Sequence, residues 1–147
     1  MNLSDWADRG WLVPHRTSPQ EIAELLAVAD RDLADCRAEG LGANWRLNIA
    51  YNAALQAATA ALAAAGYRPG REAHHYRTIK SLAFTIRADA ATVRTFDVFR
   101  KKRNVGTYER IGTVSDHEAR EMEALANRLR RQVETWLRKN HPELLSV

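Results

Sequence analysis

The sequence predicts an all-α protein, an antiparallel bundle of about five helices. Glycine and proline are scarce and fall between segments rich in alanine and leucine. Apolar residues recur in those segments with the 3.6-residue period of an α-helix, and few stretches alternate as a half-buried strand requires. The 147 residues are enough for one domain with its own core. We therefore expect a single domain over residues 1–147, with residues 1–16 as an N-terminal arm or short helix.

The first long helix is predicted to begin after Ser18. This serine is a capping residue type, Pro19 suits the first helical position, and Glu21 has capping-box spacing. Gly40 and Gly42 are expected to end the helix. Its apolar face consists of Ile22, Leu25, Leu26, Ala29, Leu33 and Cys36.

Alanine dominates the second predicted helix, between residues 50 and 65. Asn44 offers a cap at its start, and Gly66 offers a stop at its end. Small side chains permit neighbouring helices to approach closely, so we expect this helix at the centre of the bundle. Its larger side chains are Leu47, Tyr51, Leu55 and Leu62.

Three more helices are predicted in the second half of the chain. Apolar spacing indicates one from Arg71 onward, through Ile86, and Asp89 is a candidate cap for the next. After an interruption, Ser115 and Glu118 repeat the capping-box spacing and open the longest helix. The apolar stripe of this last helix is Met122, Leu125, Ala126, Leu129, Val133, Trp136 and Leu137.

Composition excludes several classes of protein. The single cysteine, Cys36, cannot form an internal disulfide. No stretch approaches the roughly 20 consecutive apolar residues of a membrane span, and the N-terminus lacks the apolar core of a signal peptide. We therefore expect a cytoplasmic protein. Lys and Arg number 22 against 18 Asp and Glu, a net charge of +4 that permits a polyanionic partner without requiring one.

The segment 94–110 is the least ordinary part of the chain, with six Lys and Arg residues against Asp97 and Glu109. Within it, Arg103, Asn104 and Tyr108 bring a guanidinium, a carboxamide and a phenol close together where a helix is about to end. These groups can bind a phosphate, hold a base edge and stack on a base, so they are candidate catalytic residues. The candidate phosphate- or RNA-binding residues are Arg100, Lys101, Lys102 and Arg103. Alternatively, these cations offset the helix dipole and Tyr108 is a packing residue.

The order of these features resembles the HEPN superfamily. The resemblance extends from about Trp11 to Leu137 and rests on the alanine-rich segment 50–58, the stop Gly66-Tyr67-Arg68-Pro69, the segment 103–108 and the capped helix at Ser115. It implies a small helical bundle that forms a homodimer. HEPN domains occur as RNA-cleaving toxins, as partners of minimal nucleotidyltransferases and in defence. The implied partners are therefore RNA or a nucleotide, and a nucleotidyltransferase or antitoxin.

The active members of this family carry an arginine followed, after four to six residues, by a histidine. Arg103 and Asn104 match the start of this motif, but Tyr108 stands five residues after Arg103 and the next histidine is His117. A phenol with a pKa of about 10 is a poor general base at neutral pH. In the members paired with a nucleotidyltransferase, a tyrosine two residues beyond the histidine can be nucleotidylated, and Arg110 holds that place here. The sequence therefore favours weak or no nuclease activity.

Other residue types give weaker signals. Adjacent helical residues point about 100° apart, so at most one of His74 and His75 can face a given site, and we interpret the pair as a solvated helix start. The histidines and Cys36 lack the paired spacing of a zinc site, so no metal or cofactor is predicted. The charged residues of the last helix, including Arg128 and Arg131, alternate with glutamates and are interpreted as ordinary surface.

Three hypotheses follow from the sequence, and they leave open whether the protein is an enzyme. The first is an RNA- or nucleotide-binding module of HEPN type, within a toxin–antitoxin or defence system. The second is an active endoribonuclease toxin in which Arg103 and a polar neighbour suffice, or in which a histidine arrives from elsewhere in a dimer. The third is a structural or partner-binding helical bundle without a phosphate site.

Overall fold

The protein is an all-α bundle, as the sequence predicts. The computed structural model describes residues 1–106 and 114–146, and for residues 104–106 it describes the backbone only. This described part contains six α-helices and one short pair of strands. The elements are α1 (Leu3–Asp8), β1 (Leu12–Pro14), α2 (Pro19–Asp35), α3 (Ala43–Ala64), β2 (Tyr67–Pro69), α4 (His74–Ser81), α5 (Ala90–Gly106), α6 (Asp116–Asn140) and the 3₁₀ helix η1 (Pro142–Leu145).

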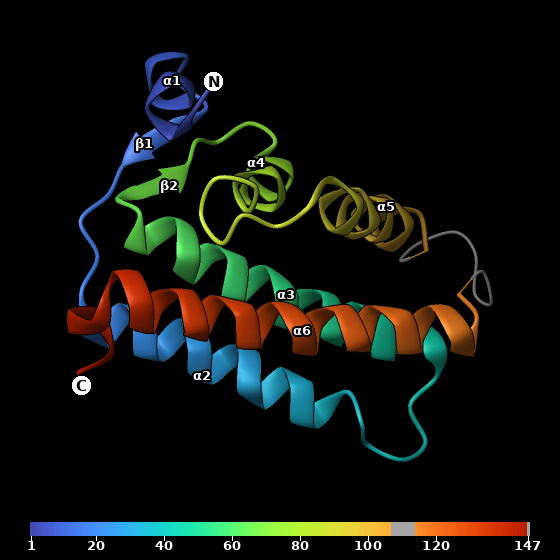
Figure 1. Ribbon diagram of the computed structural model, residues 1–147. Coiled ribbons are helices and arrows are strands. Elements are labelled where there is room, and N and C mark those ends of the chain that lie inside the picture. Colours follow the sequence, from blue (N-terminus) through green and yellow to red (C-terminus); the bar gives the residue numbers. More distant parts are fainter. Residues whose placement is uncertain (107–113, 147) are drawn as a thin grey trace.

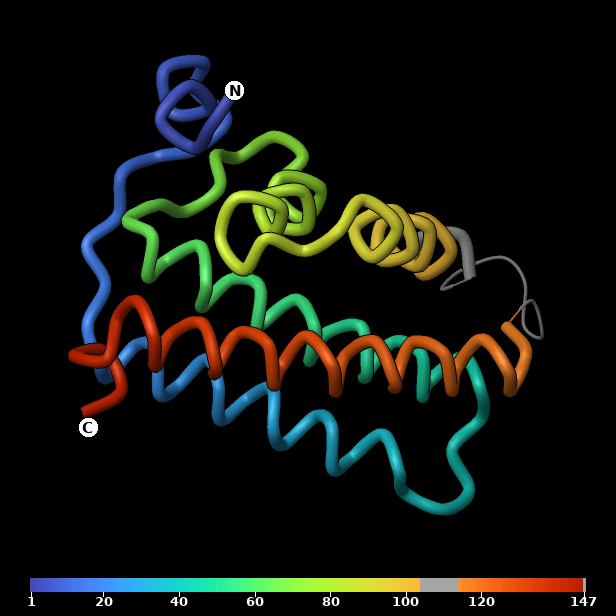
Figure 2. Tube along the Cα trace, in the orientation of Figure 1, coloured from blue at the N-terminus to red at the C-terminus, as the bar shows by residue number. Residues whose placement is uncertain are grey.

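Three long helices, α2, α3 and α6, lie side by side, and α3 contacts both of the others (Figure 1). On another side of α3 lie α4 and α5. The strands and α1 are at one end of the bundle, and η1 brings the end of the chain back to α2 (Figure 2). In this arrangement both the start of α4 and the end of α5 reach Tyr51 of α3.

Serine caps begin both α2 and α6, as predicted. Ser18 Oγ accepts a hydrogen bond from the Glu21 amide over 3.1 Å. Ser115 and Glu118 form a complete capping box, with both reciprocal hydrogen bonds present. The box predicted at Ser18 is only half formed, because the Glu21 carboxylate accepts a hydrogen bond from Thr17 Oγ1 instead.

The alanine-rich helix α3 is enclosed by the rest of the chain, as predicted. It begins after Gly42, whose extended backbone forms the N-cap, so Asn44 lies inside the first turn and is not the predicted cap. The chain leaves α3 through Gly66, whose φ of 100° lies in the region that favours glycine. The buried alanines of α3 are Ala50, Ala53, Ala54, Ala57, Ala58, Ala60, Ala61 and Ala63.

The third predicted helix is shorter in the structure than the sequence indicates. It spans only His74–Ser81, and the end of the predicted apolar stripe lies in the connection that follows, residues 82–88. Ser81 Oγ donates a hydrogen bond to the Thr78 carbonyl over 2.6 Å, a local bond that competes with helical pairing. Arg87 then takes a left-handed backbone conformation, with a φ of 57°, before α5 begins.

One antiparallel pair of strands was not predicted. Leu12–Pro14 pairs with Tyr67–Pro69 and ties the N-terminal arm to the segment between α3 and α4. Three residues per strand are too few for an alternating pattern to be recognised. Beside this pair the backbone at Gly70 lies close to the backbone at Gly10. A Cβ on Gly70 would lie only 2.9 Å from the carbonyl oxygen of Gly10.

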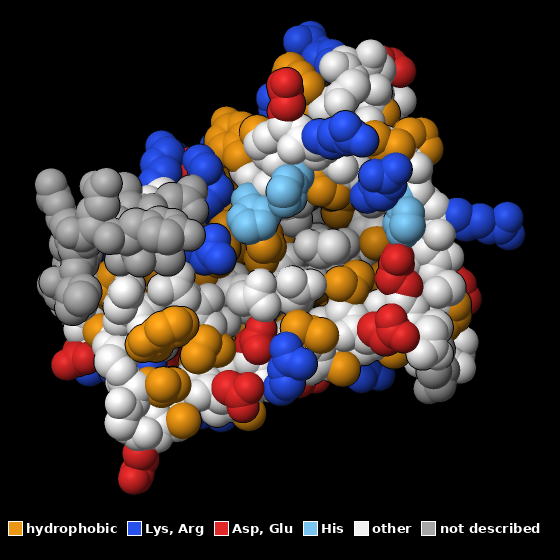
Figure 3. All heavy atoms as spheres, turned by 180° about the vertical axis from the view of Figure 1, so that it is seen from behind, with side chains coloured by type: hydrophobic (Ala, Val, Ile, Leu, Met, Phe, Trp, Pro, Cys, Tyr) orange, Lys and Arg blue, Asp and Glu red, His pale blue; other side chains and the backbone are white. Residues whose placement is uncertain are grey.

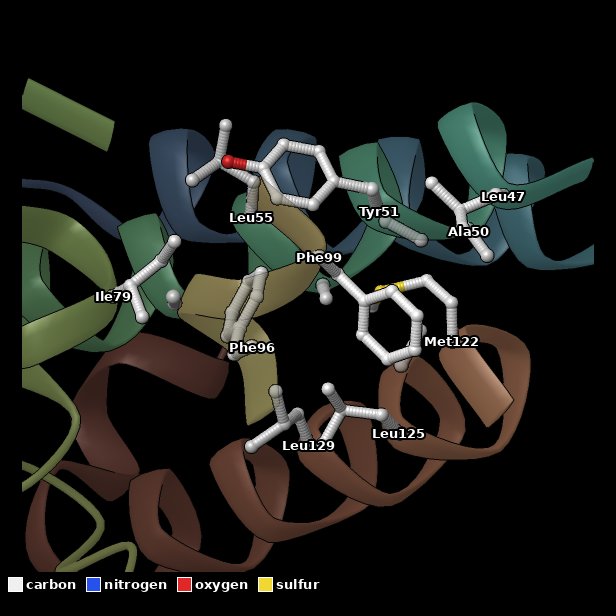
Figure 4. Close-up of a cluster of buried hydrophobic side chains, with 14 of the residues drawn as sticks. Leu47, Ala50, Tyr51, Leu55, Ile79, Phe96, Phe99, Met122, Leu125 and Leu129 are labelled. Atoms are coloured by element: carbon white, nitrogen blue, oxygen red, sulfur yellow. The ribbon is translucent and has the colours of Figure 1, made fainter. Parts of the chain in front are cut away.

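The centre of the core lies where α3, α5 and α6 meet (Figure 4). Tyr51 of α3 packs edge-on against Phe96 of α5, with ring centroids 5.5 Å apart. The predicted stripe of α6 is buried, with the exception of Trp136, which is half-buried; its first part, through Leu129, packs in the same cluster as Tyr51 and Phe96. This packing fixes α5, including its basic end, against α3.

Candidate phosphate-binding site

The described part of the basic segment, residues 94–106, lies in α5. This helix begins at its predicted cap, where Asp89 Oδ1 accepts a hydrogen bond from the Thr92 amide over 2.7 Å. Arg103 lies in the last turn of α5 and is half-buried. Its guanidinium carbon is 5.1 Å from the centroid of the Tyr51 ring, a distance at which a cation is attracted to an aromatic face. Arg103 therefore lies against the edge of the core.

The four cations predicted to bind phosphate have different partners in the structure. Arg100 Nε lies 2.7 Å from Asp97 Oδ1, and Lys101 Nζ lies 3.6 Å from Asp97 Oδ2. Lys102 forms an ion pair with Glu118 of α6, and its hydrogen bond is the main reason that the pKa of this carboxyl is lowered. Lys102 thus ties α5 to α6, while Arg100 and Lys101 share one carboxylate.

Two of the candidate catalytic residues cannot be placed beside Arg103. Tyr108 lies outside the described residues, and so does the side chain of Asn104. Their predicted roles, like the phosphate contacts of the four cations, stay predictions.

His75 is a site residue that sequence reasoning missed. It is half-buried at the start of α4, and its Nδ1 lies 3.4 Å from the Tyr51 hydroxyl, within reach of a hydrogen bond. His74 is exposed, and its ring packs edge-on against His75 with centroids 4.7 Å apart. The interpretation as a solvated pair is therefore wrong for His75, because its side chain points toward α3.

Burial determines the protonation of this cluster. The pKa of His75 is lowered from 6.5, first by its removal from water and then by the positive charges of His74, Arg103 and Arg100. Burial also raises the pKa of Tyr51 to about 12. At neutral pH the imidazole is accordingly neutral and the phenol is protonated. Because a phenol both donates and accepts, Tyr51 can orient either neutral tautomer of His75.

A hollow with a volume of about 260 Å³ opens beside His75. On the face of the molecule in Figure 3, two adjoining histidine side chains lie next to Lys and Arg side chains. Arg100 lines the hollow and its guanidinium carbon is 5.4 Å from the Tyr76 ring centroid. The complete lining is Ala73, His74, His75, Tyr76 and Arg100.

This arrangement places the Arg100 guanidinium, which is also paired with Asp97, beside an imidazole that can accept a proton. Guanidinium groups bind phosphate oxygens through two parallel hydrogen bonds and stabilise charge that develops on phosphorus-bound oxygen. A neutral imidazole can remove a proton from a hydroxyl near neutral pH. In the described part of the chain, no three metal-ligating side chains are grouped to hold an ion, and no helix is long and apolar enough to cross a membrane.

The fold is an all-α bundle, and this hollow brings one arginine and two histidines together on its surface. Comparisons of the chain with family models, with curated proteins and with solved structures find no match. The resemblance to the HEPN superfamily therefore stays a prediction.

One signal in the sequence could have identified the missed residues. Tyr51 is a large side chain with a hydroxyl within an alanine-rich stretch, and such a hydroxyl needs a polar partner when it is buried. The sequence does not reveal that the partner is His75, because this contact depends on how α4 packs on α3.

Proposed function

We propose that the protein binds single-stranded RNA through its phosphates, at the hollow between the start of α4 and the end of α5. The observation that supports this most is that Arg100 and His75 line one small hollow, while Arg103 packs on the neighbouring Tyr51 ring and its charge contributes to the lowered pKa of His75. The exposed His74 ring at its rim offers a surface on which a base can stack. The HEPN resemblance suggests the same class of ligand, and a role in a toxin–antitoxin or defence system belongs to this proposal.

A second candidate function is cleavage of that RNA. It is favoured by the lowered pKa of His75, which leaves the imidazole free to accept a proton from a ribose 2′-hydroxyl. Attack of the resulting oxygen on the adjacent phosphate would form a 2′,3′-cyclic phosphate and release the 5′-oxygen of the next nucleotide, which would take the proton from the His75 imidazolium. Arg100 or Arg103 would stabilise the charge on the phosphate. His75 would then fill the role for which the arginine motif lacks a histidine.

Binding is tested with a fluorescently labelled single-stranded RNA at several salt concentrations. We expect affinity to decrease as salt increases, because counterions are released when phosphates are neutralised. Arg103→Ala should weaken binding by about 1–3 kcal/mol, the scale of a hydrogen bond to a charged group. Arg94→Ala removes an equal charge from an exposed position near the start of α5 and is the matched control.

Two results would contradict the proposal. One is equal binding by the Arg103→Ala and Arg94→Ala variants. The other is a loss of thermal stability in Arg103→Ala without any change in RNA affinity. The second result would make Arg103 a structural cation at the helix end, and the hypothesis of a purely structural bundle would take precedence.

Cleavage is tested on the same RNA by gel analysis over time. His75→Asn should abolish cleavage while RNA affinity changes little, because an amide keeps polar contacts but cannot accept the proton. Tyr108→His restores the histidine of the family motif and is expected to increase cleavage. Cleavage that persists in His75→Asn would remove this residue from the reaction.

A further inference from the structure

A second and larger hollow lies between the α4–α5 connection and the C-terminal half of α6. Figure 1 shows these two segments beside each other. The hollow has a volume of about 890 Å³, within the range of sites that bind small ligands. It shares no lining residue with the hollow beside His75. Its lining consists of residues 84–87, Arg128, Arg131, Gln132, Thr135, Trp136, Lys139 and Asn140.

Cations line this hollow without any lining carboxylate. They are Arg87 from the connection and Arg128, Arg131 and Lys139 from α6. Within the described residues, none of the four forms an ion pair, whereas Arg130 and Arg138 of the same helix both pair with Glu134. The α6 surface is therefore divided into one side with internal ion pairs and one side with uncompensated positive charge. The prediction that this whole surface is ordinary does not anticipate that division.

One carboxylate, that of Asp89, interacts electrostatically with one of these cations, Arg128. Hydrogen bonds from Thr92 lower the pKa of Asp89, and the charges of Arg128 and Arg94 add to the effect. Asp89 is already the cap of α5, so its hydrogen-bonding capacity is used in part by that helix. It does not line the hollow, which keeps a strong positive excess.

An aromatic surface accompanies these cations. Trp136 lines the hollow while it is half-buried against the core, so its ring is held in place by packing. The His141 ring lies 4.9 Å from it and supports it from the end of α6. Asn140 Nδ2 donates to the Trp136 carbonyl over 3.0 Å, which leaves the amide oxygen of Asn140 as an acceptor.

We propose that this hollow binds a nucleotide, with its base against Trp136 and its phosphates among Arg128, Arg131 and Lys139. Arginine forks match the geometry of phosphate oxygens, and an indole face stacks on a purine or pyrimidine. Gln132, Thr135 and Asn140 provide polar groups for the base edge or the ribose. An acidic peptide would satisfy the cations, but it would leave the fixed aromatic surface without a planar partner.

The test is a titration of the whole protein with ATP, followed by calorimetry and by tryptophan fluorescence. We expect saturable binding that quenches fluorescence, weaker binding of tripolyphosphate, and little binding of adenosine. Arg128→Ala and Arg131→Ala should each lower the affinity for ATP about tenfold, because each removes charge-assisted hydrogen bonds. Trp136→Phe should remove the quenching while calorimetric binding is weakened and not lost.

Arg138→Ala is the matched control, since it removes the same charge from the same helix at a residue outside the hollow. It should bind ATP as the unmodified protein does. Far-ultraviolet circular dichroism of each variant checks that the bundle remains folded. Arg103→Ala separates the two sites: it should keep ATP binding, while Arg131→Ala should keep RNA binding at the hollow beside His75.

The following outcomes would overturn the proposal. These are equal ATP affinity in the Arg128→Ala, Arg131→Ala and Arg138→Ala variants, binding of tripolyphosphate as tight as that of ATP together with no effect on Trp136 fluorescence, and competition by an acidic peptide at lower concentration than ATP. Binding of a long RNA without binding of any mononucleotide would likewise reject a nucleotide site.

Discussion

His75 makes the stability of the protein sensitive to pH at the level of a single residue. The folded chain holds the pKa of this imidazole below 6.5, chiefly by burial. The unfolded chain therefore binds a proton more readily than the folded chain as the pH falls through about 6.5. It follows that the contribution of His75 to the free energy of unfolding is fully present above that pH and decreases below it.

We expect His75→Asn to reduce this pH dependence. Urea denaturation between about pH 7.5 and pH 5.5 should show a free energy of unfolding that falls less steeply in the variant than in the unmodified protein. His117→Asn, which alters an exposed histidine of α6, is the control and should keep the original slope. An unchanged slope in His75→Asn would mean that its imidazole is solvated in the folded protein.

At the level of a single element, the capping box at the start of α6 gives a direct test of helix stability. Ser115→Ala removes the oxygen that accepts from the Glu118 amide and should lower the free energy of unfolding by about 1 kcal/mol. Ser115→Asp keeps an acceptor at the cap and should lie close to the unmodified protein. Urea denaturation measures both, and equal losses in the two variants would indicate that the cap contributes nothing.

Helix starts and stripes could be predicted because they depend on residues near one another in the sequence. Ser18, Asp89 and Ser115 each cap a helix that the apolar period locates, and the structure confirms all three. The early end of α4 could not be predicted, because residues 82–88 continue the apolar spacing although the helix ends at Ser81. The strand pair could not be predicted because it depends on contacts between distant segments, and its short strands show no alternating pattern in the sequence.

The candidate site was predictable only in part, because part of it also depends on contacts between segments that are distant in the sequence. The basic end of α5 is a local feature, and its place at the end of a helix follows from the sequence. His75, which adds a proton acceptor to the site, is 24 residues from Tyr51 in the chain. The two side chains meet because α4 packs on α3. Likewise, spacing along α6 does not reveal that Arg128 and Arg131 face Arg87 across a hollow.

At the scale of the whole molecule, the predicted homodimer needs a surface other than α3. The alanines that would permit close approach of a second chain are already buried against the other helices of the same chain. Among the described residues, the large apolar side chains with high exposure are Met1, Trp45 and Val98. We expect light scattering to give a dimer mass at micromolar concentration. A monomer mass across that range would contradict the homodimer.

The enclosure of α3 determines how the whole bundle tolerates changes in volume. Ala54 is fully buried among helices that contact α3 on several sides, so added methylene groups have no free space to occupy. We expect Ala54→Leu to lower the free energy of unfolding by about 1–3 kcal/mol through displacement of neighbouring side chains. Ala27→Leu places the same side chain on the exposed face of α2 and should change stability little. Urea denaturation compares the two, and equal stability would mean that the helices around α3 move apart at no cost, contrary to a close-packed centre.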